Sequence, residues 1–270
     1  KVNRASSNID FGVGIRVLKG DQTGFAYSEN VSLEDMLNAA KMAASIANEN
    51  ATFKTGELTE KIPSSFYQIS RQWEDVPVKD KVPFVQKIND KVFELDEKVI
   101  KVNASLNDET SYVLFYNSEG RLTYDYRPMV SFSAFCVMQK GDKIENGYAA
   151  RSFRKGFEWM DDNLVAELAK EAVDKTNILF EATKPRAGEM PVVMGAGGSG
   201  ILLHEAIGHT FEADFNRKGT SIFSDKMGKK VAESFINIID DGTLENNRGS
   251  LNVDDEGNDV EKTYLVKDGV

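Results

Sequence analysis

Two histidines and a glutamate gather in one short stretch of the chain. His204, Glu205 and His209 stand within six consecutive positions, and the two histidines are the only ones among 270 residues. Histidine is the commonest side-chain ligand of transition metals, and a glutamate beside a metal-bound water can act as a general base. These residue types point to half of a metal-dependent hydrolase site, with the histidines as ligands and Glu205 as the base.

The spacing of the histidines restricts the backbone that could bring them together. The common zinc-protease motif places its histidines four residues apart on a helix, whereas His204 and His209 are five apart. A regular α-helix turns about 100° per residue, so it would point these side chains about 140° apart. Either the helix widens locally into a π-bulge, or it ends near Gly208 and lets His209 swing back. The spacing alone leaves open a structural role, with His204 in a core and His209 as a cation at a helix end.

A glycine-rich turn precedes the histidine helix. Residues 195–200 read G-A-G-G-S-G between a strand expected at 191–194 and the helix, which is the setting of a dinucleotide-binding turn. That fold also requires a strand ending in an acid about 20 residues later, and none follows. We therefore expect the turn to let backbone approach the active centre and to offer amides to a peptide carbonyl. The residues expected to do so are Gly197, Gly198, Ser199 and Gly200.

The elements that position the motif follow from periodicity and turn residues. Alternating residues predict a hairpin over 11–28, and a capping pattern begins a helix at Ser32 that runs to Asn48. Further helices are expected over 79–95, with Pro83 in the first turn, and over 161–180. Period-two runs predict strands at 99–106, 112–116, 122–126, 130–138 and 146–153. The fold class is α+β, with helices packed on an antiparallel or mixed sheet.

A linker-like break at 184–189 divides the chain. We expect an N-terminal α+β domain over 1–185, and over 186–270 the beginning of a β-rich domain that carries the motif helix. Residues 240–242 and 254–257 are expected as chain reversals in this second part. The chain lacks an initiator methionine and stops inside a strand-like run, so we expect it to be a piece of a longer protein.

Composition narrows the classes of function. The net charge of -10 disfavours direct nucleic-acid binding, because phosphates repel an acidic surface. No apolar run approaches the roughly 18 residues of a membrane span, so no membrane partner is expected. Cys136 is the single cysteine, which excludes an intrachain disulfide and suits a reducing compartment, the cytoplasm. It lies in a strand-like run and is expected to be a buried small hydrophobe rather than a metal ligand.

The block from 200 to 220 resembles the TldD-type members of the TldD/PmbA family. The family signature is H-E-x-x-x-H followed five residues later by aspartate, and the matching residues are His204, Glu205, His209 and Asp214. Weaker similarities to the family lie at 12–14, 23–27, 240–243 and 254–257. The family was long labelled a modulator of DNA gyrase and is understood as zinc peptidases. The sister TldE/PmbA group lacks the histidines, so this chain resembles the catalytic type.

The resemblance implies a zinc ion held by His204 and His209, with Glu205 activating the bound water. Catalytic zinc sites normally hold three protein ligands, and two histidines alone make a poor site. The family's third ligand is a cysteine in a carboxy-terminal segment, which is expected beyond Val270. Asp214 and Glu212 are candidates for the carboxylates that orient the imidazoles through their other nitrogens.

The implied function is a metallopeptidase that acts on peptides and unfolded segments, which bind as an added strand at a sheet edge. The resemblance also implies a dimer, formed with itself or with a TldE/PmbA-type subunit. Two alternatives remain open at this point. One is a non-catalytic regulatory or binding protein of the gyrase-modulator type, and the weaker one is a nucleotide-binding oxidoreductase built on the glycine turn.

Overall fold

The structure is a computed structural model and describes residues 3–46 and 55–270. Its contacts divide the chain into two compact units. The first comprises residues 1–59 and 117–120, and the second comprises residues 60–116 and 121–270. The domain division expected near residue 185 stays a prediction. In the part of the chain that the structure describes, no helix has both the length and the apolar character needed to cross a bilayer.

The first unit is a hairpin with one helix packed on it. Strands β1 (Val13–Lys19) and β2 (Gln22–Ser28) pair antiparallel, and α1 (Leu33–Ile46) follows them. The Ser32 hydroxyl accepts a hydrogen bond from the Asp35 amide at 3.1 Å, which is half of the expected capping pattern. Gly24 lets the helix approach closely, since a Cβ there would collide with the carbonyl of Ala43. The predicted hairpin and helix start are confirmed, while residues 47–48 of the expected helix lie outside the described residues.

The second unit is built on a long antiparallel meander. Its strands are β4 (Val99–Tyr116), β5 (Arg121–Lys140) and β6 (Lys143–Phe153), and the short β3 (Thr59–Lys61) also pairs with β5. The predicted meander is confirmed, but the strand lengths were wrong. The five expected strands merge into three. The reason is that β4 and β5 stay in register through the polar stretch 107–111, where Asp108 pairs with Val130 and Thr110 with Pro128. Each strand supplies the other with backbone partners, so polar side chains do not end the pairing.

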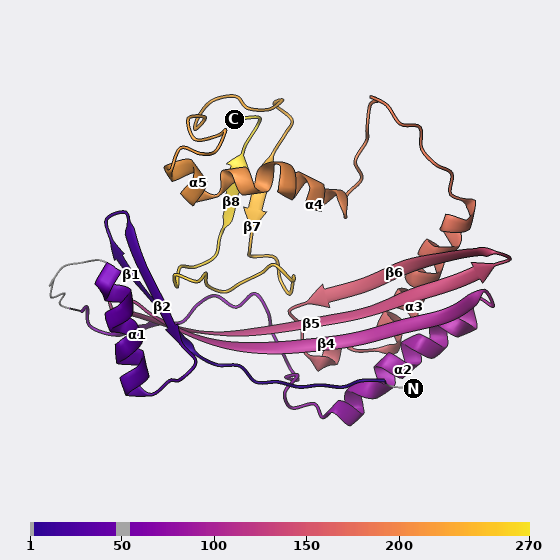
Figure 1. Cartoon of the computed structure of the whole chain (residues 1–270), viewed down its shortest axis with the longest axis horizontal. Helices are drawn as coiled ribbons and strands as arrows, with labels where there is room; N and C mark the ends of the chain where they lie inside the picture. Colours follow the sequence, from indigo (N-terminus) through magenta and orange to yellow (C-terminus); the bar gives the residue numbers. More distant parts are fainter. Residues whose placement is uncertain (1–2, 47–54) are drawn as a thin grey trace. The chain divides into compact units, whose positions relative to one another are not determined.

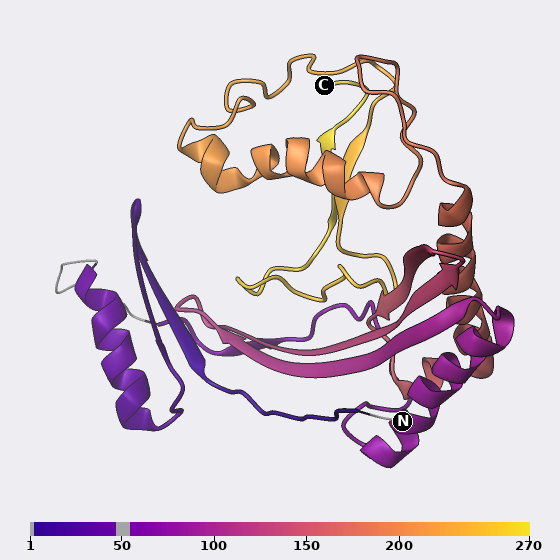
Figure 2. The ribbon, with the colours of Figure 1, turned by 45° about the vertical axis from the view of Figure 1, so that its right-hand side comes forward.

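Two helices cover one face of the meander. Helices α2 (Val78–Leu95) and α3 (Asp162–Asn177) pack side by side on the sheet (Figures 1 and 2). Asp161 begins α3 by accepting a hydrogen bond from the Leu164 amide at 2.7 Å. The core lies between sheet and helices, and its fully buried members include Ile88, Val92, Val130, Phe132, Ala134, Cys136, Met138, Leu168 and Ala172. The α+β class predicted from the sequence is therefore confirmed.

The helix boundaries differ from the predicted ones. Pro77 is the N-cap of α2, with φ -64° and ψ 149°, so the helix begins at Val78 and Pro83 lies in its second turn. The expectation that Pro83 falls in the first turn was wrong. Helix α3 ends at Asn177, and a 3-10 turn, η2 (Ile178–Glu181), replaces its expected last turn. Another 3-10 turn, η1 (Phe157–Trp159), precedes α3.

The remaining residues form short elements around the histidine motif. In chain order they are α4 (Ser199–Leu203), η3 (His204–Gly208), η4 (His209–Phe211), α5 (Ala213–Arg217), β7 (Ile238–Asp241) and β8 (Lys262–Val266). The strand expected at 191–194 was wrong: Val192 and Val193 are 74% and 98% exposed, and no described strand pairs with them. Asp240 and Asp241 lie in β7 instead of at a reversal, while 254–257 forms the expected turn.

A buried polar cluster ties the loop 242–260 to the meander. Asp125 of β5 is almost fully buried and accepts hydrogen bonds at 2.9 Å from the Tyr67 hydroxyl and the Asn252 amide. Arg127 pairs with the same carboxylate at 2.7 Å and donates to the Val253 carbonyl at 2.9 Å. A buried carboxylate with this many partners is satisfied, and losing one partner would leave its charge uncompensated. The loop between β7 and β8 is thereby fixed to the sheet.

Candidate metal site

The two histidines are joined by the backbone hydrogen bond that defines a π-helical turn. The N–H of His209 donates to the carbonyl of His204, five residues earlier, and η3 (His204–Gly208) is the turn that this bond closes. A regular α-helical bond would reach back only four residues. Of the two backbone arrangements that the spacing allowed, the π-bulge is the one that the structure has.

The widened turn brings three donor side chains together. The imidazole centroids of His204 and His209 are 4.4 Å apart with ring planes at 66°. One ligand atom from each of His204, Glu205 and His209 lies within 4.8 Å of the others, and Glu205 is 3.7 Å from Nε2 of His209. Two ligands of one zinc ion lie at most about 4 Å apart, because each bond is about 2 Å long. The donor atoms of the cluster are no more than 4.8 Å apart, so a small rotation of the side chains would bring them to the separation that one zinc ion requires.

Glu212 holds the His209 ring from its other side. Its carboxylate lies 2.5 Å from Nδ1 of His209, and this hydrogen bond raises the pKa of the imidazole. Because the carboxylate accepts, Nδ1 carries the proton and the lone pair of the neutral ring is on Nε2. That nitrogen is the one nearer to Glu205. A carboxylate that orients an imidazole must bind the ring nitrogen that faces away from the metal. The contact of Glu212 with Nδ1 of His209 meets this requirement.

Asp214 has a different neighbour. Its carboxylate lies in α5 and pairs with Lys218 at 3.4 Å, four residues later on the same helix. The structure therefore brings Glu212, but not Asp214, to an imidazole. The role expected for Asp214 stays a prediction, and its described contacts are those of a helix surface pair.

Side chains after the motif bind its free backbone carbonyls. The Asn216 amide donates to the carbonyls of Thr210 and Glu212, both at 2.9 Å, and the Ser221 hydroxyl donates to Thr210 at 2.6 Å. The rings of Phe211 and Phe223 stack with centroids 4.5 Å apart. The sequence motif does not predict these roles. Short polar side chains just past a helix often bind its last carbonyls, and that signal could have indicated Asn216.

The glycine turn is open to its surroundings. Gly197 has φ +119°, which favours glycine, but a Cβ on Gly198 or Gly200 would meet nothing within 4 Å. The Ser199 hydroxyl hydrogen-bonds back to the Gly195 carbonyl. Packing among the described residues therefore does not explain why positions 198 and 200 are glycine. Their expected contact with substrate stays a prediction.

Cys136 lies in the core and not at the motif. It is fully buried in β5, and burial raises the pKa of its thiol. Among the residues that the structure describes, the one cluster of at least three metal-binding side chains is His204, Glu205 and His209. The expectation that Cys136 is a buried small hydrophobe is confirmed.

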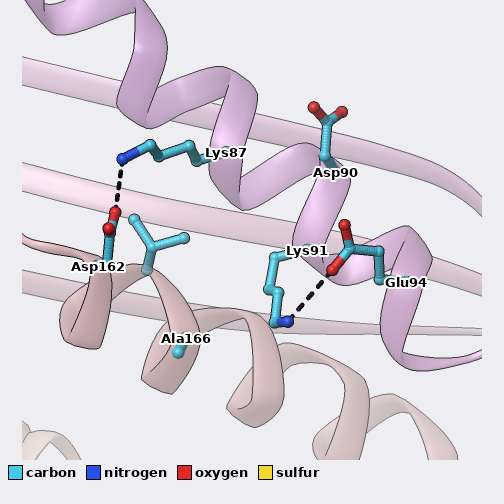
Figure 3. A pocket seen from close by; sticks show the side chains of 7 residues that line it. Lys87, Asp90, Lys91, Glu94, Asp162 and Ala166 are labelled. Carbon is cyan, nitrogen blue, oxygen red and sulfur yellow. Dashed lines mark hydrogen bonds and ion pairs between the residues drawn. The ribbon is translucent and has the colours of Figure 1, made fainter.

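A shallow pocket of about 410 Å³ lies between α2 and α3 (Figure 3). Four of its five charged side chains form ion pairs, Lys87 with Asp162 at 2.6 Å and Lys91 with Glu94 at 3.2 Å, and the fifth is Asp90. None of the motif residues lines it. Because no motif residue lines the pocket and both of its lysines are already paired with carboxylates, we assign it no role in the chemistry of the motif.

Three family models match consecutive parts of the chain. They describe PmbA/TldA metallopeptidase domain 1, the central domain and the C-terminal domain, and match residues 1–47, 71–180 and 187–270. The chain belongs to the TldD/PmbA family. The segment matched by the third model, residues 187–270, includes the histidine motif, and the family resemblance expected from residues 200–220 is confirmed.

Curated relatives of this TldD/PmbA chain carry metalloprotease names. Metalloprotease TldD homologues from Buchnera aphidicola and Haemophilus influenzae are each 37% identical over all of this chain and 57% of their own length. A zinc metalloprotease TldD homologue from Saccharolobus solfataricus is 26% identical over 98% of this chain and 58% of its own. The chain thus spans less than two thirds of the length of these relatives.

Solved structures share the fold. A Thermotoga maritima protein described as a modulator of a DNA gyrase matches with a TM-score of 0.77 and 21% identity, over 97% of this chain and 59% of its own. TldE from Thermococcus kodakarensis matches with a TM-score of 0.66 and 21% identity, over 94% of this chain and 57% of its own. At these identities the similarity concerns the fold alone.

Proposed function

We propose that the protein carrying this chain is a zinc-dependent peptidase. The observation that carries the proposal is the π-turn of η3, which places the imidazoles of His204 and His209 with centroids 4.4 Å apart and Glu205 beside them. Two imidazoles and a neighbouring carboxylate are the donor types of catalytic zinc sites. The metallopeptidase descriptions of the family models agree with this chemistry.

Each residue of the cluster has a role in the proposed reaction. His204 and His209 would hold the ion, and Glu212 keeps Nε2 of His209 free to bind by accepting from Nδ1. A bound zinc ion lowers the pKa of its water and polarises the scissile carbonyl. Glu205 would take the proton of that water and pass it to the leaving amine. The third ligand would be a cysteine outside this sequence.

The substrate class and partners are also proposals. Peptides and unfolded segments fit a site whose surrounding backbone is glycine-rich and exposed. Such a surface can form hydrogen bonds with the main chain of a substrate and contacts its side chains less. Assembly with itself or with a TldE-type subunit follows from the family, in which TldE has the same fold. The cytoplasm remains the expected location.

The test is Glu205→Gln in the full-length protein. This change keeps the size of the side chain and removes the base, so peptide hydrolysis should fall at least 10²-fold while zinc content stays the same. Glu189→Gln, the same chemical change at an exposed position before the glycine turn, is the matched control and should leave both unchanged. Turnover that survives Glu205→Gln would remove Glu205 from the mechanism.

A non-catalytic regulatory protein is the second candidate, favoured by the gyrase-modulator description of the Thermotoga maritima structure. It requires no metal, so metal analysis of the full-length protein with and without His209→Ala separates the two candidates. Zinc that is lost with His209 supports the peptidase, and function without metal supports the regulator. The nucleotide-binding alternative has lost its structural setting, because no strand leads into the glycine turn.

A further inference from the structure

Gly208 is the last residue of the π-turn and directly precedes His209, and its own backbone conformation does not require glycine. Its φ of -55° and ψ of -53° are ordinary helical values. Glycine destabilises a helix relative to alanine, so another residue would make a more stable helix here. The reason for glycine must lie outside the backbone.

The space above Gly208 is filled by an imidazole. A Cβ built on Gly208 would lie 2.8 Å from Nδ1, 3.2 Å from Cγ and 3.5 Å from Cε1 of His204. Comfortable contacts between such atoms are about 3.5–4.0 Å. The ring of His204 therefore lies against the position that any side chain at residue 208 would occupy.

We propose that Gly208 is a positioning residue for the metal site, an inference that rests on the proposed function. The π-turn aligns positions 204 and 209, but the His204 ring reaches His209 only by lying over residue 208. A methyl group there would push the His204 ring out of contact with the His209 ring. The wide turn and the missing side chain together create the two-histidine site.

The chain offers a matched control for zinc binding at Gly200, whose expected contact is with substrate and not with the ion. This glycine lies in α4, in the same helical run, and a Cβ on it would meet nothing within 4 Å. Alanine at either position should favour the helix by a similar amount. Only the methyl group at 208 would touch an imidazole.

The experiment compares wild type, Gly208→Ala and Gly200→Ala in the full-length protein. Thermal melting without metal shows whether each variant folds, and both should melt at or above the wild-type temperature. Zinc affinity is then measured by competition with a chromophoric chelator. We expect Gly200→Ala to match the wild type and Gly208→Ala to bind at least tenfold more weakly, with an altered Co²⁺ absorption spectrum.

A second measurement keeps the inference testable without metal. The nuclear Overhauser contact between the imidazoles of His204 and His209 should be present in wild type and Gly200→Ala and lost in Gly208→Ala. Equal zinc affinity, or a retained contact between the rings, in a folded Gly208→Ala variant would overturn the role of Gly208. A wild-type protein that binds no zinc would instead overturn the proposed function, while the ring contact still tests what the glycine does.

Discussion

The core of the second unit and the histidine segment, residues 195–217, are built on different principles. In the core, Phe132 and Leu168 are completely buried between the sheet and the helices. In the histidine segment, Ile201, Leu202 and Leu203 are 68%, 62% and 48% exposed. Burial explains the residue types of the core, whereas in the histidine segment the convergence of donor atoms explains His204, Glu205 and His209.

The two regions also keep their shape by different forces. The core is held by apolar contacts between elements far apart in sequence. The histidine segment is held by local bonds: the π-turn, the Glu212 contact to His209, and the carbonyl contacts of Asn216 and Ser221. Stability and metal binding should therefore respond to different substitutions.

The largest effect should come from the core. Phe132→Ala removes a fully buried ring from β5 and leaves a cavity, so the free energy of unfolding should fall by about 3–5 kcal/mol. Urea unfolding measures the loss, and zinc affinity of the protein that remains folded should be unchanged. A cost below 1 kcal/mol would mean that the sheet is not the stabilising part of the molecule.

An intermediate effect should arise where α2 and α3 end. The Asp96 carboxylate accepts hydrogen bonds from Lys98 and, at 2.9 Å, from the Asn177 amide, which together lower its pKa to about 2. A depressed folded-state pKa stabilises the fold above the unfolded-state value of about 4, and the gain is lost as pH falls from about 5 to about 2. Solvent screens this partly exposed carboxylate, so the contribution is about 1 kcal/mol at neutral pH.

Asp96→Asn should therefore reduce stability at pH 7 by about 1 kcal/mol and by little near pH 2. Denaturant midpoints across this range measure the difference. Asn177→Ala removes only one of the donors and should give a smaller loss with the same direction of pH dependence. A wild-type and Asp96→Asn pair that differ equally at pH 7 and pH 2 would contradict the assignment.

The sequence predicted the core well because periodicity reports burial. The helix expected over 161–180 corresponds to α3, the period-two run expected at 130–138 lies in β5, and both contribute residues to the core. The strand prediction failed where backbone pairing continues through polar side chains, as at 107–111 inside β4. The prediction from the sequence also failed at 191–194. An apolar run suggests a strand, but it does not show whether a partner strand is available, and no described strand pairs with these residues.

The histidine segment was predictable in its chemistry but only partly in its geometry. Residue types and spacing indicated the ligands and limited the backbone to two arrangements, of which the π-turn is the one observed. The contacts of Gly208 and Asn216 were not predictable in this way. They depend on where an imidazole and a carbonyl come to lie after the turn has formed, which a spacing does not report.

The smallest effect should come from the exposed apolar side chains of the motif helix. Leu202→Ala removes a side chain that is 62% exposed, so the free energy of unfolding should change by no more than about 0.5 kcal/mol. Leu168→Ala is the matched control, a helical leucine in the core, and should cost about 2–5 kcal/mol. Comparable losses for the two leucines in the full-length protein would mean that another segment or a partner packs on the motif helix. The contrast between a packed core and an open histidine segment would then hold for this chain and not for the full-length protein or its assembly.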